Sequence, residues 1–237
     1  MSDFLFFAEE IVGEMAFFGA EESRHCIRTL RNREGDEIRF TDGKGNLFHG
    51  NIEDPDLYRM SAKAFSETKM KRRAFTLAVA LAIPKNPDRF EWFVEKSTEL
   101  GIHSIVPLIT DRTEKKNINL ARIQKIAISA LKQSQQYYLP EIYCPIPISD
   151  LSEKFSAWPM GIAYCNGNER LSLYEFAGKN PKALIIIGPE GDFSENEMNI
   201  LSALPLSKVL SFGNGILRTE TAGVYAASAY RLLFCND

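Results

Sequence analysis

Long apolar runs and a basic leader segment are both missing from this chain of 237 residues. Its longest apolar stretches, such as Leu77 to Ile83, fall far short of the roughly 20 residues that a membrane-spanning helix needs. The apolar patch from Phe4 to Phe7 follows Asp3 with no basic residue before it, which is not the pattern of a secretory signal peptide. We therefore expect a cytoplasmic protein with no membrane partner.

Cysteine and histidine are scarce and scattered. The four cysteines, Cys26, Cys144, Cys165 and Cys235, form no CxxC pair. This spacing is typical of reduced thiols in the cytosol rather than of a disulfide framework or a zinc site. With only three histidines in the chain, the sequence predicts no metal centre.

Charge gives no strong indication of a partner. The net charge is -3, and residues 1–70 carry 9 basic and 14 acidic side chains, against 19 and 17 in residues 71–237. A chain of this overall charge needs no nucleic-acid partner. A basic face is nevertheless compatible with it, because local patches rather than totals set the surface potential.

Residues 1–70 are expected to form a small β-barrel with one helix. The segment Asp36–Thr41 alternates polar and apolar residues as a strand does, and Leu47–Ile52 is its expected partner strand. The intervening Asp42–Asn46 holds two glycines, which is the composition of a tight hairpin turn. Glu21–Arg31 is expected to form a short helix with four basic side chains.

A change of pattern near residue 70 predicts a domain boundary. The stretch Glu67–Arg73 is strongly charged, and after it apolar segments alternate with helical ones, which indicates an α/β domain with a mostly parallel sheet over residues 71–237. The expected strands are Thr76–Ile83, Ile105–Ile109, Gly161–Cys165 and Leu184–Ile187. The expected helices are Pro87–Leu100, Leu120–Gln136, one opened by the capping box of Ser194 and Glu197, and Glu220–Leu233.

Two glycine-bearing loops predict a ligand pocket. Gly188–Ser194 follows the apolar run Ala183–Ile187, and Phe212–Ala222 follows the strand-like Lys208–Ser211. Each is a strand, a tight loop and a helix in sequence, and open α/β sheets bind ligands at such loops. Neither loop fits the dinucleotide or P-loop pattern. We therefore expect a ligand pocket that is formed by backbone groups and is less common than a dinucleotide or P-loop site.

An ordered set of motifs in both halves of the chain resembles the RsmE family. The family consists of bacterial methyltransferases of the SPOUT class that modify uracil N3 in 16S ribosomal RNA. The motifs in the second half are Leu81–Lys85, Glu95–Gly101, Gln133–Ser134, Ile187–Gly191 and Ile216–Ala222. Those in the first half are His25, Leu30–Arg31, Gly35–Asp36 and Asp42–Gly45.

The resemblance implies an architecture and a cofactor. Residues 1–70 would form a PUA-like RNA-binding β-barrel, and residues 71–237 a trefoil-knotted SPOUT methyltransferase domain. S-adenosyl-L-methionine would lie bent in the knot, between the two glycine loops and the loop around Cys165 and Asn166. The enzyme would act as a homodimer on 16S rRNA within the assembled small ribosomal subunit.

The same resemblance supplies candidate cofactor contacts. They are Cys165, Asn166, Ile187, Gly188, Pro189, Glu190, Gly191, Leu210, Phe212, Gly213, Ile216, Leu217, Thr219 and Thr221. We interpret Gly188, Gly191 and Gly213 as positions where the backbone approaches the cofactor closely, because glycine has no side chain to keep it away; the alternative is that they are turn residues only. Thr219 and Thr221 either contact the cofactor or cap the last helix.

Methylation of uracil N3 also requires a proton to leave. Arg218 is the leading candidate for steering the substrate or stabilising negative charge on the uracil carbonyls. The alternative is a structural ion pair with Glu190 or Glu220. These two glutamates are the candidate bases, or else partners of a helix N-terminus.

Six basic side chains are candidate RNA contacts: Arg24, His25, Arg28, Arg31, Lys85 and Lys96. The first four share one short predicted helix and are equally compatible with a solvated basic face. Lys96 lies three residues from Glu99 on a predicted helix, so an ordinary surface ion pair is its alternative.

Three positions depart from the family pattern. Asp192 stands where the family usually has a second glycine, and Gly215 and Gln136 stand where it often has arginine. Asp192 and Gly215 leave open the alternative of a ribosome-assembly protein that binds RNA without catalysis. A SPOUT methyltransferase acting on another rRNA or tRNA site is a second alternative, against which the PUA-like part and the motif Leu217–Ala222 argue.

Overall fold

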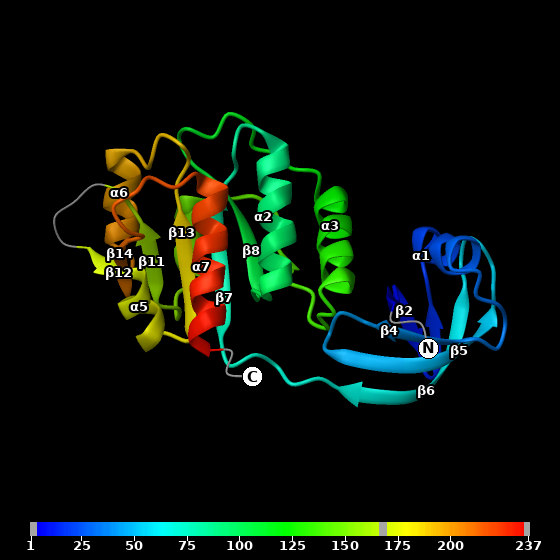
Figure 1. Cartoon of the computed structure of the whole chain (residues 1–237). Helices are drawn as coiled ribbons and strands as arrows, with labels where there is room; N and C mark the ends of the chain where they lie inside the picture. Colours follow the sequence, from blue (N-terminus) through cyan, green and yellow to red (C-terminus); the bar gives the residue numbers. More distant parts are fainter. Residues whose placement is uncertain (1–3, 166–169, 235–237) are drawn as a thin grey trace. The chain divides into compact units, whose positions relative to one another are not determined.

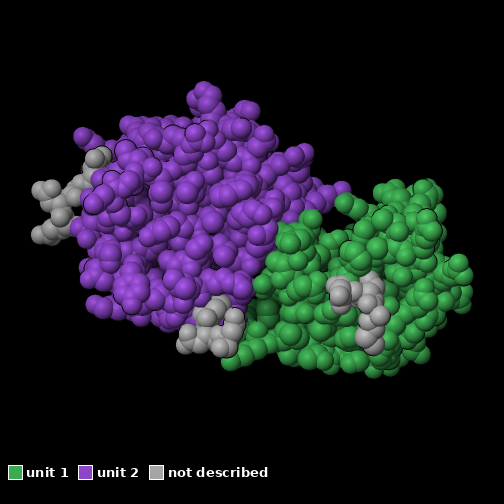
Figure 2. Space-filling view, in the orientation of Figure 1, with its two compact units in different colours: residues 1–72, 128–139 green, residues 73–127, 140–237 purple. Residues whose placement is uncertain are grey.

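The computed structural model describes residues 4–165 and 170–234 and divides the chain into two compact units (Figures 1 and 2). The first unit contains residues 1–72 together with 128–139. The second contains residues 73–127 and 140–237. The helix α3 (Leu120–Gln133) therefore begins in the second unit and ends in the first, and the chain returns to the second unit at Pro140.

The first unit is built on one six-stranded sheet. The order of its strands is β1-β4-β5-β6-β3-β2, with β1 parallel to β4 and every other pair antiparallel. The expected hairpin is confirmed, because β4 and β5 pair in register from Glu37 opposite Asn51 to Thr41 opposite Leu47. The strands are β1 (Leu5–Phe7), β2 (Glu10–Val12), β3 (Met15–Phe17), β4 (Glu37–Thr41), β5 (Asn46–Asp54) and β6 (Ser61–Lys69).

Aromatic rings fill the core of this unit. Phe40 lies between Phe18, at 5.4 Å between ring centroids, and Phe48, at 5.2 Å. The turn between β4 and β5 is held by the Asp42 side chain, which accepts from the backbone N–H of Lys44 at 2.8 Å. The sequence pattern and the packing thus agree on the register of this hairpin.

The expected basic helix is shorter than predicted. Helix α1 covers Ala20–Arg24 and continues as a π-helical turn over His25–Thr29. The backbone N–H of Leu30 reaches the carbonyl of His25 at 3.0 Å, which closes that wide turn. The prediction that the helix reaches Arg31 is wrong, because Arg31 takes a left-handed backbone conformation with φ of 61° and ends it.

The second unit has one parallel sheet, which confirms the predicted α/β class. The order of its strands is β10-β8-β7-β13-β11-β14-β12, and β9 pairs with β8. Its long central strands are buried on both faces, which explains their continuous apolar sequences. The strands are β7 (Thr76–Ala82), β8 (Ser104–Ile109), β9 (Glu141–Ile142), β10 (Ile146–Pro147), β11 (Met160–Ala163), β12 (Leu171–Ser172), β13 (Lys182–Ile187) and β14 (Ser207–Ser211).

Helices cover both faces of this sheet (Figure 1). On one face α7 packs against α2 so closely that a Cβ on Gly223 would lie 2.5 Å from the Phe93 ring. Leu151 of α4 and Leu201 of α6 belong to the core cluster on the other face. The helices of this unit are α2 (Pro87–Leu100), the first part of α3 (Leu120–Gln133), α4 (Leu151–Lys154), α5 (Leu173–Lys179), α6 (Glu195–Ser202) and α7 (Thr219–Phe234).

Helix ends follow their local sequence. Asn86 caps α2 by accepting from the N–H of Asp88 at 3.0 Å, and Gly101 ends the helix with φ of 73°. The capping box predicted at Ser194 and Glu197 is present at the start of α6. Helix α3 ends at Gln133, three residues before the predicted end, and Gln135 is left-handed with φ of 53°.

Candidate active site

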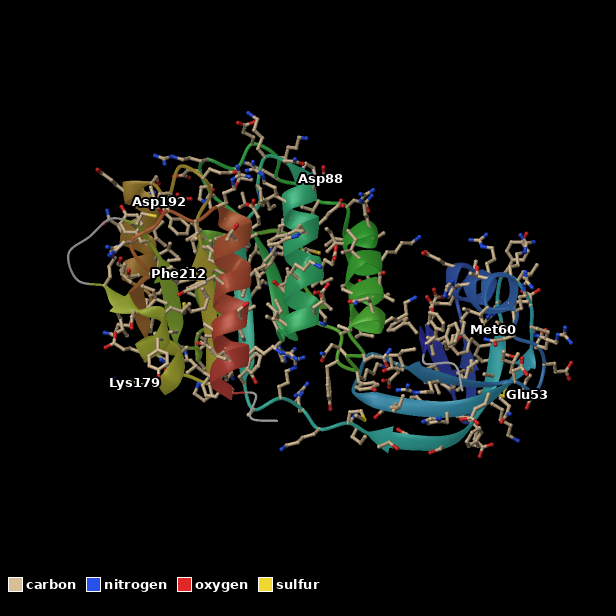
Figure 3. The ribbon with its side chains drawn as sticks, in the orientation of Figure 1. Glu53, Met60, Asp88, Lys179, Asp192 and Phe212 are labelled. Carbon is tan, nitrogen blue, oxygen red and sulfur yellow. The ribbon has the colours of Figure 1, made fainter. Side chains whose placement is uncertain are left out.

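A cavity of about 250 Å³ lies at the carboxyl ends of β11, β13 and β14. These three strands are neighbours in the order β13-β11-β14, so the loops that follow them meet at one edge of the sheet. Figure 3 labels Asp192 on the loop after β13 and Phe212 on the loop after β14. This is the position at which open α/β sheets bind ligands.

The cavity brings together most of the candidate cofactor contacts. From the end of β11 comes Cys165, and from β13 and its loop come Ile187, Gly188, Pro189 and Glu190. The second glycine loop and its flanks contribute Leu210, Phe212, Gly213, Ile216, Leu217 and Thr219. Gly191 and Thr221 do not line the cavity, and Asn166 falls outside the described residues.

One hydrogen bond joins the two glycine loops. The buried Thr219 hydroxyl donates to the carbonyl oxygen of Gly188 at 3.0 Å. Thr219 is the first residue of α7 and not the residue before the helix, so its hydroxyl does not occupy the N-cap position. Thr219 therefore fixes the spacing of the loops that form the cavity.

Different physical constraints favour glycine at positions 188, 191 and 213. Gly213 is left-handed with φ of 107°, and a Cβ there would meet nothing within 4 Å. A Cβ on Gly188 would lie 3.1 Å from the Phe193 ring, and one on Gly191 would lie 2.9 Å from Nη1 of Arg112. Packing within the protein thus restricts these last two positions.

Asp192 occupies a backbone conformation that favours glycine. Its φ is 63°, which aspartate tolerates better than most residues. Its carboxylate accepts from two backbone N–H groups, that of Phe193 at 3.0 Å and that of Cys165 at 3.3 Å. The side chain therefore links the loop after β13 to the loop after β11.

Arg89 of α2 is a site residue that the sequence analysis missed. It lies 3.0 Å from the Glu190 carboxylate and 3.8 Å from that of Glu220. Glu220 is 7% exposed, and its Oε2 atom has no hydrogen-bond partner among the described residues. No spacing signal could have revealed this contact, because Arg89 lies 101 residues from Glu190 in sequence.

Arg218 is exposed and forms no ion pair within the described parts of the chain. The alternative in which it pairs with Glu190 or Glu220 is therefore wrong, since Arg89 takes that role. The sequence analysis also overlooked Tyr164, Arg170 and Asn214, which line the cavity. They belong to irregular loops, where periodic patterns give no signal.

The candidate RNA contacts fall into two groups. Lys85 and Lys96 form ion pairs: Lys85 with Glu114 at 3.0 Å, and Lys96 with Glu95 and Glu99. Hydrogen bonds to these two carboxylates, that of Glu95 first, raise the pKa of Lys96. The three candidate arginines of the first unit, Arg24, Arg28 and Arg31, are exposed, and His25 lies edge-on to Phe4 at 5.8 Å.

Residues 4–165 and 170–234 contain neither a metal-binding cluster nor a membrane-spanning helix. No group of three or more His, Cys, Asp or Glu side chains there is arranged to hold a metal ion. None of the helices in these ranges is long and apolar enough to cross a membrane.

Comparison with known proteins identifies the family. The sequence profile of an RNA methyltransferase domain matches residues 71–231, and that of an RNA methyltransferase PUA domain matches residues 18–57. Ribosomal RNA small subunit methyltransferase E of Rickettsia conorii is 32% identical over 214 residues, which cover 88% of this chain and 86% of that protein. The chain belongs to the RsmE family.

Solved structures agree with this membership in the RsmE family. A probable rRNA-methyltransferase from Porphyromonas gingivalis is 32% identical, with a TM-score of 0.89 and 98% of each chain covered. The ribosomal RNA small subunit methyltransferase E from Neisseria gonorrhoeae bound to S-adenosyl methionine is 26% identical, with a TM-score of 0.84 over 98% of each chain. The structural similarity therefore covers both units of this chain.

Proposed function

We propose that this protein transfers a methyl group from S-adenosyl-L-methionine to N3 of a uracil in 16S ribosomal RNA. The observation that carries the proposal is the cavity between two main-chain loops at the ends of β13 and β14. It occurs in a chain whose relatives include rRNA small subunit methyltransferases, one of them solved with S-adenosyl methionine. The enzyme would work in the cytoplasm, where its rRNA substrate is.

The cavity suits this cofactor chemically. Among the described residues, the backbone N–H groups of Asn214, Gly215 and Ile216 have no hydrogen-bond partner, so they are available to acceptor atoms of adenine and ribose. Ile187, Leu210 and Leu217 supply an apolar wall. The cofactor, when bound, supplies a methyl group activated on a positively charged sulfur. The protein's main contribution is to hold it in line with the acceptor, which is worth about 7–11 kcal/mol.

Arg218 and Glu190 would serve the acceptor base. The exposed guanidinium of Arg218 is free to stabilise charge that develops on the uracil carbonyls. Of the two candidate bases, Glu190 lines the cavity with a side chain 44% exposed, whereas the Glu220 side chain is 9% exposed. We therefore assign proton removal from N3 to Glu190, and to Glu220 the anchoring of Arg89.

Larger-scale features of the family complete the proposal. Residues 71–237 would form the trefoil-knotted catalytic domain, and residues 1–70 a PUA-like barrel that contacts RNA through Arg24, Arg28 and Arg31. Apolar side chains on and near α7 are exposed: Ile216 at 87%, Tyr225 at 48% and Leu232 at 83%. An exposed apolar set of this kind supports a homodimer.

Small ribosomal subunits that lack the modification provide the test. Incubation with the protein and S-adenosyl-L-methionine should produce 3-methyluridine in 16S rRNA, detected by mass spectrometry of nucleosides. A methylated ribose, or product formed only on tRNA, would instead assign the protein to another SPOUT activity. Binding of the subunit without cofactor binding, measured by calorimetry, would identify an RNA-binding assembly protein.

A further inference from the structure

Among the described residues, three charged side chains line the cavity: Arg170, Glu190 and Asp192. Glu190 is neutralised by Arg89 at 3.0 Å. Arg170 donates to the backbone carbonyls of Tyr164 at 3.3 Å and Cys165 at 2.8 Å. Asp192 forms no ion pair within the described residues, so its carboxylate is the acidic group in the described cavity wall that has no salt-bridge partner.

The Asp192 carboxylate is also held in place. Backbone N–H groups on two different loops donate to its two oxygens, at 3.0 Å from Phe193 and 3.3 Å from Cys165. Arg112 contacts the backbone carbonyl of Asp192 at 3.2 Å rather than the carboxylate. The side chain therefore cannot turn away without breaking the bond from Phe193 within its own loop and the bond from Cys165 that joins the two loops.

The charge of Asp192 acts on a neighbouring group of the cavity wall. Burial, followed by the Asp192 charge, raises the pKa of the Cys165 thiol, while Arg170 opposes the shift. The Asp192 carboxylate therefore acts electrostatically on the part of the cavity wall that includes Cys165.

We propose that Asp192 makes this pocket selective for the charged methyl donor over its neutral product. The inference rests on the proposed function. The sulfur of S-adenosyl-L-methionine carries a positive charge, and once the methyl group has left, the sulfur of S-adenosylhomocysteine carries none. The two molecules are otherwise the same, so an uncompensated carboxylate contributes attraction to the first and little to the second. The weaker attraction for S-adenosylhomocysteine also favours its release after the methyl group has been transferred.

Calorimetric titration of Asp192→Asn tests the charge separately from the shape. The purified full chain is titrated with S-adenosyl-L-methionine, with sinefungin, whose amine is charged at the equivalent position, and with S-adenosylhomocysteine. Asparagine keeps the size of the side chain and an acceptor oxygen. We expect roughly five- to tenfold weaker binding of the two charged ligands, and less than about twofold change for S-adenosylhomocysteine.

Two further variants control for structure. Glu195→Gln removes an exposed carboxylate from the first turn of α6, outside the cavity, and should change none of the three affinities. Asp192→Gly suits the left-handed backbone but removes the hydrogen bond between the loops as well as the one within the loop, so it should weaken the binding of all three ligands. Equal losses for the three ligands in Asp192→Asn, or no loss, would overturn the inference. Failure of the unmodified protein to bind any of them would overturn the proposed function instead.

Discussion

Thr219 donates its hydroxyl hydrogen to the carbonyl oxygen of Gly188 at 3.0 Å, in a buried contact between residues 31 apart in sequence. The bond joins the loop after β13 to the first residue of α7. Both partners line the same cavity. The separation of the two loops therefore depends on a side chain as well as on the sheet.

Replacing Thr219 by valine should weaken both folding and cofactor binding. Valine has nearly the same shape but no hydroxyl, so the Gly188 carbonyl loses its donor in a buried place. We expect a loss of about 1–3 kcal/mol in the free energy of unfolding, measured in urea. Thr219→Ser keeps the hydroxyl and is the control; equal stability and S-adenosyl-L-methionine affinity of the two variants would show that the bond has no such role.

Arg218→Ala should reduce turnover far more than cofactor affinity. The guanidinium is exposed and has no ion pair within the described residues, so its removal leaves the fold intact. Loss of one group that stabilises developing charge costs roughly 10²–10³ in kcat. Single-turnover methylation of small subunits and calorimetry with the cofactor measure the two effects. Parallel losses in both would place Arg218 in the cofactor pocket.

Arg89→Met should destabilise the second unit. The substitution leaves the Glu220 carboxylate buried with no cation, while methionine retains the apolar stem. We expect a loss of about 2 kcal/mol, less than for a fully buried pair, because a third of the Arg89 side chain is exposed. The double variant Arg89→Met with Glu220→Gln should recover part of the loss. If the losses of the two single variants add up to the loss of the double variant, the ion pair contributes nothing to the free energy of unfolding.

Alkylation of Cys165 should depend on pH and on Asp192. The raised pKa means that less thiolate is present at a given pH than for a free cysteine, so reaction with iodoacetamide should rise only at higher pH. Asp192→Asn removes one cause of that shift, lowers the pKa and should speed the reaction near pH 8. Peptide mass spectrometry follows the site; an unchanged rate in the variant would contradict the coupling.

RNA binding should depend on the exposed arginines of the first unit. The double variant Arg24→Ala with Arg28→Ala should weaken binding to small subunits and lower the slope of log affinity against log salt by roughly 0.7–0.9 for each phosphate that is no longer neutralised. Lys154→Ala removes an exposed cation from α4 and is the control. A salt slope equal in both variants would argue against phosphate binding by these arginines.

Much of the fold could be predicted because its main signals are local. The strands β7 and β13 contain the continuous apolar runs 77–82 and 183–187, and the ends of α2 are marked by Pro87 and Gly101. Strands β9, β10 and β12 have two residues each, too few to show any periodicity. The π-helical turn after Arg24 depends on backbone bonding that composition does not encode.

The loops that form the site could be predicted from the sequence, whereas the contacts between their side chains could be predicted less well. The two glycine loops are contiguous in sequence, so each is visible as a motif. Arg89 could not be found in this way, since its ion pairs cross from α2 to two later segments. The position of Asp192 in a glycine-rich loop was visible, but its bond to the Cys165 backbone depends on the neighbouring strand order.

Strand β11 lies between β13 and β14 and so determines the distance between the two loops that form the cavity. Two steps between adjacent strands separate the ends of β13 and β14 by about 9.6 Å, since each step is about 4.8 Å. Backbone hydrogen bonds between the strands set this distance, and they form with almost any side chain at these positions. A substitution on the loops, such as glycine by aspartate, therefore leaves the spacing of these strand ends unchanged.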